Sequence, residues 1–157
     1  MAKNNILAKT IGTGFGSGYW PWGPGTAGAL LATVIWWLLG YVLSACWLTV
    51  FTSVLCVVFY VAGVWAANRL EPEWGEDPSR VVVDEMVGVW IPLLVAPPLS
   101  WPYAVAAFLL FRFFDILKPL GIRRMEALGG GTGVMMDDVL AGVYSAILLA
   151  LARLISA

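Results

Sequence analysis

The chain has 157 residues, of which 61% are hydrophobic and 12% charged, with a formal net charge of −1 and no histidine. A soluble domain is about 45–50% apolar and about 25% charged, and a globule this small could not hide the excess. The composition therefore excludes an ordinary soluble domain and gives no basic run for a nucleic-acid partner, and it predicts a single domain, residues 1–157, in a lipid bilayer.

The first part of the chain contains two uncharged apolar segments, residues 27–43 and 46–67. Each is close to the roughly 20 residues that a membrane-spanning helix requires. They follow a short N-terminus and a glycine-rich stretch that lack the apolar core of a signal peptide, so no cleavable signal is expected. The next segment, residues 68–80, holds six charged residues and is predicted to lie in water as a loop, including Glu71, Glu73 and Glu76.

Three further apolar segments follow, and each carries acidic residues near one end: residues 81–99, 101–117 and 134–155. None of the apolar runs alternates as a membrane β-barrel strand must, so helices are the better interpretation. We therefore predict an all-α fold, a polytopic membrane helical bundle with about five membrane segments.

The basic residues predict the orientation of this bundle. With five crossings, the N-terminus, residues 68–80 and residues 118–133 lie on one side of the membrane. That side holds most of the basic side chains: Lys3, Lys9, Arg69, Arg80, Lys118, Arg123 and Arg124. The loops on the other side are uncharged, so the positive-inside rule predicts that the charged side is cytoplasmic. Arg153 is the exception, and we expect it to reach the far interface.

The same reasoning brings the ends of three segments to one depth, each with acidic side chains. These are Asp84 and Glu85 at the start of the third segment, Asp115 near the end of the fourth, and Asp137 and Asp138 at the start of the fifth. A charge at membrane depth costs about 2.5–3.5 kcal/mol, so such residues are functional candidates. Together they would repel one another without a cation, and oxygen ligands suit Mg²⁺ or Ca²⁺. Arg112 and Lys118 are interpreted as phosphate contacts.

Simpler structural roles stay open for several of these residues. Asp137 or Asp138 could cap the last segment, because Asp is a favoured N-cap. Arg112 and Asp115 are spaced i, i+3 and could form a helix-surface ion pair. The two adjacent carboxylates of the third segment point in different directions, so one of them could instead pair with an arginine.

Two glycine-rich stretches, residues 12–28 and 129–133, could cradle an anion with their backbone N–H groups. This signal is weak by itself, because such a stretch is more often a flexible connector. Ser17 and Thr26 could donate hydrogen bonds to a phosphate. Thr26 could equally be the N-cap of the first segment.

The missing residue types exclude several phosphate chemistries. Without histidine there is neither a phosphohistidine route nor a histidine-based triad. Cys46 and Cys56 lie in apolar surroundings and lack the arginine spacing of a cysteine phosphatase, and no nucleotide-binding loop is present. A metal-activated water and direct attack by an aspartate both remain.

Three segments, taken in order, resemble the phosphatidylglycerophosphatase A family over about residues 13–146. They are Phe15-Gly-Ser-Gly18 with Pro21 and Pro24-Gly-Thr-Ala-Gly28; Asp77 with Val83-Asp-Glu-Met-Val-Gly88; and Phe111-Arg-Phe-Phe-Asp-Ile-Leu-Lys-Pro119, continuing through Ile122, Arg123 and Gly131 to Met136-Asp-Asp-Val-Leu-Ala-Gly142. The resemblance implies a multi-pass enzyme of the bacterial inner membrane whose active site faces the cytoplasm. Such an enzyme uses Mg²⁺ to hydrolyse phosphatidylglycerophosphate to phosphatidylglycerol and inorganic phosphate.

The resemblance also implies the roles of individual residues. The implied catalytic residues are Asp84, Arg112, Asp115, Lys118 and Asp138. The implied metal ligands are Asp84, Glu85, Asp115, Asp137 and Asp138, and the implied substrate contacts are Ser17, Pro24, Gly25, Thr26 and Arg123. Two positions depart from the family pattern: Gly121 replaces a common proline, and Glu126 replaces a common aspartate and is assigned no catalytic role.

Three other functions compete with this interpretation. A phosphatase for another lipid phosphomonoester, such as phosphatidate, would use the same fold and metal site. A cation transporter would place its carboxylates near the bilayer midplane, whereas these gather at one face. A structural membrane subunit would leave the basic and acidic side chains at one depth unexplained. An oligomer is compatible with each function.

Overall fold

The computed structural model describes residues 5–156 and contains no strand among them, which confirms the predicted all-α fold. Within that range the α-helices are α1 (Ile6–Gly12), α2 (Pro24–Leu39), α3 (Ala45–Trp74), α4 (Val83–Leu93), α5 (Trp101–Leu117) and α6 (Gly130–Ser156). Short 3₁₀ turns, η1 (Ser17–Tyr19), η2 (Ile122–Arg124) and η3 (Glu126–Leu128), connect them. Lys3, which the charge pattern assigns to the cytoplasmic side, lies outside the described residues.

Helices α3 and α6 are the two described helices that are long and apolar enough to cross a membrane. At 1.5 Å per residue their 30 and 27 residues extend for about 45 and 40 Å, beyond the roughly 30 Å of a bilayer core. Only 11% and 22% of their apolar windows are buried. The core helix of a soluble protein would be mostly buried, so these exposed apolar surfaces indicate association with a membrane.

The predicted third membrane segment, residues 81–99, is only partly helical. Helix α4 has 11 residues and is about 16 Å long, too short to cross a bilayer. It contains Pro92 near its end and is followed by Pro97 and Pro98, and proline cannot donate a helical hydrogen bond. Helices α2 and α5 have 16 and 17 residues, so five full crossings are not confirmed.

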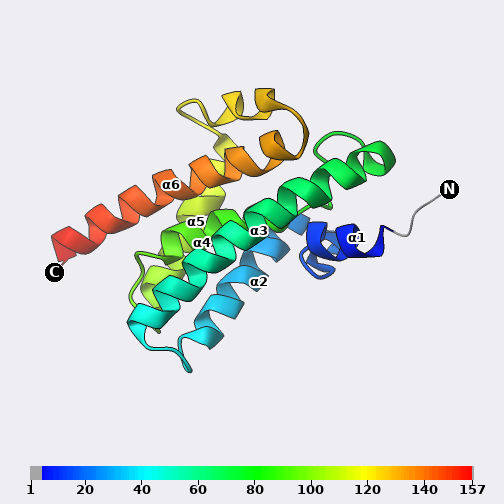
Figure 1. Cartoon of the computed structure of the whole chain (residues 1–157). Coiled ribbons are helices and arrows are strands. Elements are labelled where there is room, and N and C mark those ends of the chain that lie inside the picture. Colours follow the sequence, from blue (N-terminus) through cyan, green and yellow to red (C-terminus); the bar gives the residue numbers. More distant parts are fainter. Residues whose placement is uncertain (1–4, 157) are drawn as a thin grey trace.

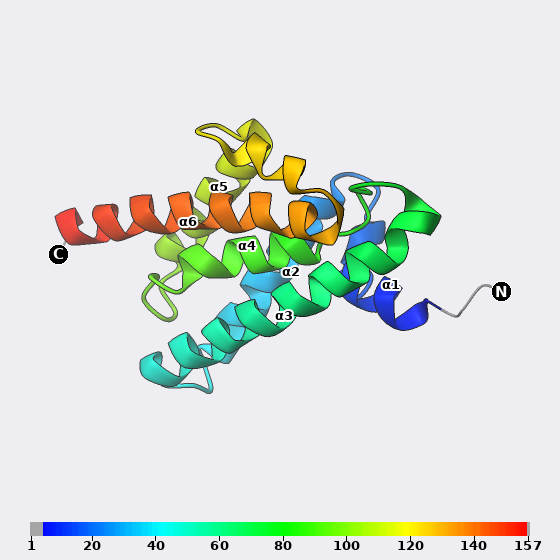
Figure 2. The same cartoon turned by 45° about the horizontal axis from the view of Figure 1, so that its top comes forward.

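Helix α4 lies at the centre of the bundle, in contact with α2, α3, α5 and α6 (Figures 1 and 2). Almost all of its side chains are buried. Glycine allows α6 to approach it closely, because a Cβ atom on Gly142 would lie 2.4 Å from the carbonyl oxygen of Gly88. On the other side, the indole N–H of Trp90 donates to the carbonyl oxygen of Ala32 on α2 at 3.0 Å. The central helix is therefore fixed between α2 and α6.

The segments predicted to share one side of the membrane do lie together at one end of the bundle. Asn68 on α3 accepts a hydrogen bond from the backbone N–H of Gly131 at 2.7 Å, and Lys9 of α1 forms an ion pair with Glu73. Helix α1 and the last turns of α6 lie at opposite ends of the bundle (Figure 1). At the far end Arg153 donates to the carbonyl oxygen of Val95 at 2.9 Å.

One local prediction at this end was wrong, and one helix was not predicted. Residues 68–74 are helical, because α3 continues through Pro72 to Trp74, so Glu71 and Glu73 lie in its last turns rather than in a loop. Helix α1 was not predicted, and it packs against α3.

Candidate active site

Three carboxylates meet where α4 begins. Asp84 and Glu85 occupy the first turn of α4, and Asp138 reaches them from α6. One carboxylate oxygen from each residue lies within 4.8 Å of the others. The close approach of α4 and α6 at their glycines brings these side chains together.

This carboxylate cluster is buried and incompletely paired. Asp84 is 7% exposed and Asp138 is 2% exposed. Asp84 Oδ1, Glu85 Oε2 and Asp138 Oδ2 are buried without a hydrogen-bond partner. Unpaired buried carboxylates are costly, and hard divalent cations prefer oxygen ligands. These residues could therefore hold a metal ion.

Arg112 lies beside the cluster, one turn before the end of α5. Its guanidinium forms an ion pair with Asp115, and the two side chains are only 17% and 13% exposed. The predicted i, i+3 pair is present, but it is partly buried at the site rather than on an open helix surface. The Nε of Arg112 is buried and has no partner, which leaves it free to donate to an anion.

Lys118 bridges two further carboxylates just beyond α5. Its Nζ donates to Asp137 Oδ2 at 2.6 Å and to Glu126 Oε1 at 2.5 Å. Burial lowers the pKa of Lys118, but the hydrogen bonds that its ammonium donates to Asp137 and Glu126 outweigh burial, and the net pKa lies above its ordinary value. The ammonium therefore stays charged at neutral pH. The sequence prediction assigned no catalytic role to Glu126. The structure shows instead that Glu126 is a partner of Lys118.

The five predicted metal ligands thus fall into two groups. Asp84, Glu85 and Asp138 form the cluster, whereas Asp115 pairs with Arg112 and Asp137 pairs with Lys118. Asp137 also accepts a hydrogen bond from the backbone N–H of Asp138 at 2.9 Å.

Both N-cap alternatives were wrong. Helix α6 begins at Gly130, so Asp137 and Asp138 lie well inside it. Helix α2 begins at Pro24 with Gly23 as its N-cap, so Thr26 lies in its first turn. Proline favours the first helical position, where its missing N–H is not needed.

The first glycine-rich stretch reaches the cluster at Gly25. A Cβ atom there would lie 2.2 Å from Glu85 Oε1 and 3.2 Å from Arg112 Nη1.

Ser17 does not show such a contact, because its hydroxyl donates to the carbonyl oxygens of Thr13 and Gly14 at 3.2 and 2.9 Å. Arg123 is exposed on η2. Of the predicted substrate contacts, Gly25 has the clearest position at the site.

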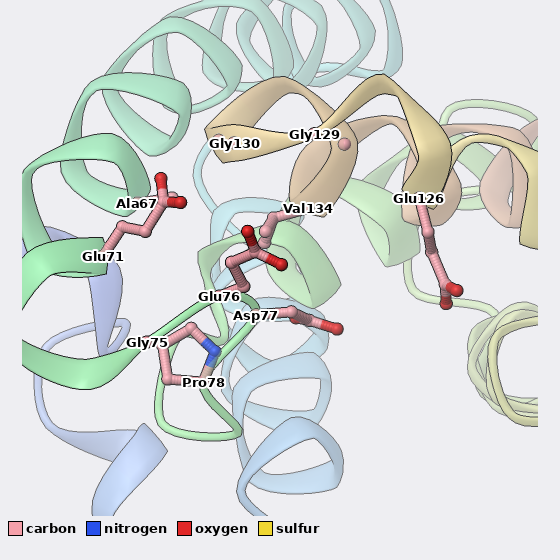
Figure 3. A pocket seen from close by; sticks show the side chains of 12 residues that line it. Ala67, Glu71, Gly75, Glu76, Asp77, Pro78, Glu126, Gly129, Gly130 and Val134 are labelled. Carbon is pink, nitrogen blue, oxygen red and sulfur yellow. The ribbon is translucent and has the colours of Figure 1, made fainter.

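A pocket of about 270 Å³ with several acidic side chains in its wall lies at this end of the bundle. Glu76 and Asp77 line it from the loop after α3, and Glu126 and the glycine-rich stretch at residues 129–133 line another side (Figure 3). Because Glu126 also contacts Lys118, the pocket adjoins the basic part of the site. Asp77 was identified as part of a motif, and the structure places it in this wall.

Comparison with known proteins adds the family context. The family model described as phosphatidylglycerophosphatase A matches residues 10–153. A relative from Bacteroides thetaiotaomicron, 62% identical over 98% of both chains, carries the provisional name phosphatidylinositol-3-phosphatase. Two relatives are named phosphatidylglycerophosphatase A. The one from Haemophilus influenzae is 40% identical over 95% of both chains, and the one from Escherichia coli is 36% identical over 87% of this chain and 77% of its own. No solved structure matches the chain.

Proposed function

This chain belongs to the phosphatidylglycerophosphatase A family and is a lipid phosphomonoester phosphatase, and from that premise we propose that its substrate is phosphatidylglycerophosphate. The products are phosphatidylglycerol and inorganic phosphate. The observation that carries the proposal is the buried cluster of Asp84, Glu85 and Asp138, with unpaired oxygens beside Arg112.

We propose Mg²⁺ as the cofactor, held by Asp84, Glu85 and Asp138. When bound, Mg²⁺ polarises phosphoryl oxygens and neutralises their charge. Asp115 and Asp137 lie next to these ligands and hold the two cationic side chains of the site in place. The unpaired oxygens and the burial of the cluster support this assignment.

Arg112 and Lys118 bind the phosphate oxygens and stabilise the charge that develops during phosphoryl transfer. The reaction breaks the bond between phosphorus and the glycerol oxygen, and the phosphoryl group is finally transferred to water. Attack by water and transient phosphorylation of an aspartate both fit the carboxylates present. Trapping the enzyme with ³²P-labelled substrate distinguishes them, because protein free of label would exclude the aspartyl-phosphate route.

The membrane arrangement belongs to the same proposal. Residues 1–157 form one multi-pass domain with about five membrane segments in the bacterial inner membrane, of which the third consists of the short helix α4 and the turns that follow it. The carboxylate end faces the cytoplasm. The exposed apolar surfaces of α3 and α6 support membrane insertion. The acyl chains of the substrate stay in the bilayer, so the site opens sideways at the cytoplasmic interface.

A phosphatidylinositol 3-phosphatase is the second candidate, because a 62% identical relative carries that name. Both substrates are phosphomonoesters on a lipid headgroup, so the same carboxylates and cations would serve. They differ in the alcohol, a flexible glycerol in one and a cyclohexane ring in the other.

The test is phosphate release by purified protein in detergent, with Mg²⁺ or with EDTA. Phosphatidylglycerophosphate, phosphatidylinositol 3-phosphate and phosphatidate are compared. We expect release from the first, dependent on Mg²⁺ and abolished by Asp138→Asn. Glu73→Gln, a similar loss of charge on an exposed side chain paired with Lys9, is the control and should remain active. Preference for another lipid would overturn the substrate assignment, and release that survives in EDTA would overturn the cofactor.

A further inference from the structure

An apolar groove runs between α2 and α5 on the outside of the bundle, with a volume of about 250 Å³. Its main lining side chains are Leu30, Val34 and Trp37 of α2 and Trp101, Val105 and Phe108 of α5. The one hydroxyl in the groove, that of Thr33, donates to the carbonyl oxygen of Ala29 at 2.8 Å. The walls of the groove are therefore formed mainly by aliphatic and aromatic side chains.

The two walls run in opposite directions and lead to the site. Leu30 and Phe108 line the end nearer the site, because α2 begins there and α5 ends there. One turn further on the same helix faces, at i−4 and i+4, lie Thr26 and Arg112. A Cβ atom added to Gly25 would lie 3.2 Å from Arg112 Nη1, so α2 and the Arg112 side chain of α5 are close at that level. The helix faces that form the groove therefore carry a hydroxyl and a guanidinium one turn closer to the carboxylate cluster.

We propose that the α2–α5 groove binds one acyl chain of the lipid substrate and so directs its phosphate to the cluster. This inference rests on the proposed function, which supplies an amphiphile with an anionic head. From Leu30 to Trp37 the apolar wall of α2 rises by about 10 Å, enough to hold a stretch of hydrocarbon. A lipid with an anionic headgroup matches both the apolar groove and the cationic side chain at its end. A second copy of the protein would account for the apolar surface but not for that cationic side chain, so we assign the groove to the lipid.

A second apolar recess shows why continuity with the site matters. It lies between α1 and α3, where Ile11, Val58 and Val61 contribute to its lining. The next turn of α3 carries Asn68 and Arg69, and Asn68 is engaged with the backbone of Gly131. Arg69 donates to Asn5 Oδ1 at 3.2 Å, so both polar side chains at the end of this recess already have partners, and the recess provides a matched control.

Filling the groove tests the proposal. Val34→Trp and Val105→Trp place an indole in the groove at positions that are 45% and 46% exposed, so the fold should tolerate them. Val58→Trp makes the same change in the other recess, where Val58 is 53% exposed. Each variant is assayed with dioleoyl and dihexanoyl phosphatidylglycerophosphate in mixed micelles. We expect the ratio of kcat/KM for the long chain to that for the short chain to fall about tenfold in the groove variants, through KM, because apolar burial of the longer chain is lost.

The same ratio should be unchanged in Val58→Trp. An unchanged ratio in the groove variants, or an equal fall in the control, would overturn the proposal. A second measurement does not depend on turnover: a phospholipid substrate analogue with a diazirine in one acyl chain is photo-crosslinked to the wild type, and the labelled peptides are identified by mass spectrometry. Label on residues 30–37 and 101–108 would support acyl-chain binding in the groove. If the protein were labelled there but hydrolysed no substrate, only the proposed function would be contradicted. Label confined to α3 overturns the groove.

Discussion

Gly25 is a residue of α2 at which the site itself leaves no space for a side chain. A Cβ atom there would lie 2.2 Å from Glu85 Oε1, the end of a flexible side chain. We therefore expect Gly25→Ala to displace the Glu85 carboxylate without disturbing the helix. The kcat should fall about tenfold or more, as for other small displacements of site groups, while the melting temperature stays close to that of the wild type. Assay and thermal unfolding in the same detergent check both.

A double-mutant cycle identifies the cause of that loss. Glu85→Asp shortens the carboxylate side chain and removes the collision. Adding Gly25→Ala to Glu85→Asp should therefore cost less activity than adding it to the wild type. Equal costs in the two backgrounds, or a lowered melting temperature, would show that α2 itself is disturbed.

Glu126 is the second residue whose role can be tested individually. Glu126→Gln keeps its shape but removes the charge that faces Lys118. Because Glu126 is 42% exposed, the pair is screened and we expect only about a two- to fivefold loss of kcat/KM. Glu126 helps to raise the pKa of Lys118, but Asp137 raises it as well, so the ammonium stays charged near neutral pH in the variant and the loss should not depend on pH there. Glu126→Asp keeps the charge and should retain the wild-type kcat/KM, and an unchanged kcat/KM in Glu126→Gln would contradict the assignment.

At the scale of elements, the contact between α4 and α6 positions the site. A Cβ atom on Gly142 would meet the backbone carbonyl of Gly88, which cannot rotate away. Gly142→Ala should therefore force the helices apart and destabilise the protein by about 1–3 kcal/mol. Activity should fall as well, because α4 and α6 carry Asp84 and Asp138. Val143→Leu, on an exposed part of the same helix, is the control for unfolding and turnover, and wild-type stability in Gly142→Ala would refute the argument.

The element scale also shows what the sequence could predict. Long uncharged runs predict helices α2 and α3 well, because the apolar character of such runs is local. The positions of the acidic residues along the chain predict that three segment ends lie at one depth. In the structure Asp84, Glu85 and Asp138 do lie together. The shortness of α4 was not predictable from hydropathy, because residues 81–99 are as apolar as a membrane span. Its burial results from packing against four other helices, which is a tertiary property.

The partners of individual side chains were harder to predict than the helices. Whether Asp137 faces the cluster or Lys118 depends on the backbone of Lys118, which adopts a left-handed conformation (φ 46°) after α5. That turn directs its ammonium between Asp137 and Glu126. No spacing rule gives this conformation to a lysine, since positive φ is uncommon for residues other than glycine.

At the scale of the whole molecule, the two native cysteines make the orientation testable. Cys46 is exposed at the start of α3, at the end of the bundle opposite the carboxylates. In a Cys56→Ser variant, a membrane-impermeant maleimide should label Cys46 in spheroplasts if the site faces the cytoplasm. Glu76→Cys, in a background with both native cysteines replaced by serine, should react only after lysis. The reverse pattern would place the carboxylates outside the cell.

The position of the carboxylates in the central helix has a consequence for the whole protein. Asp84 and Asp138 are buried in the contact on which the bundle depends, and without a counter-ion their mutual repulsion opposes folding. The carboxylates that we propose as metal ligands are thus the groups that an inert scaffold would lose first. Selection for stability alone would replace them by amides or apolar residues. Keeping them therefore lowers the stability of the fold in favour of activity.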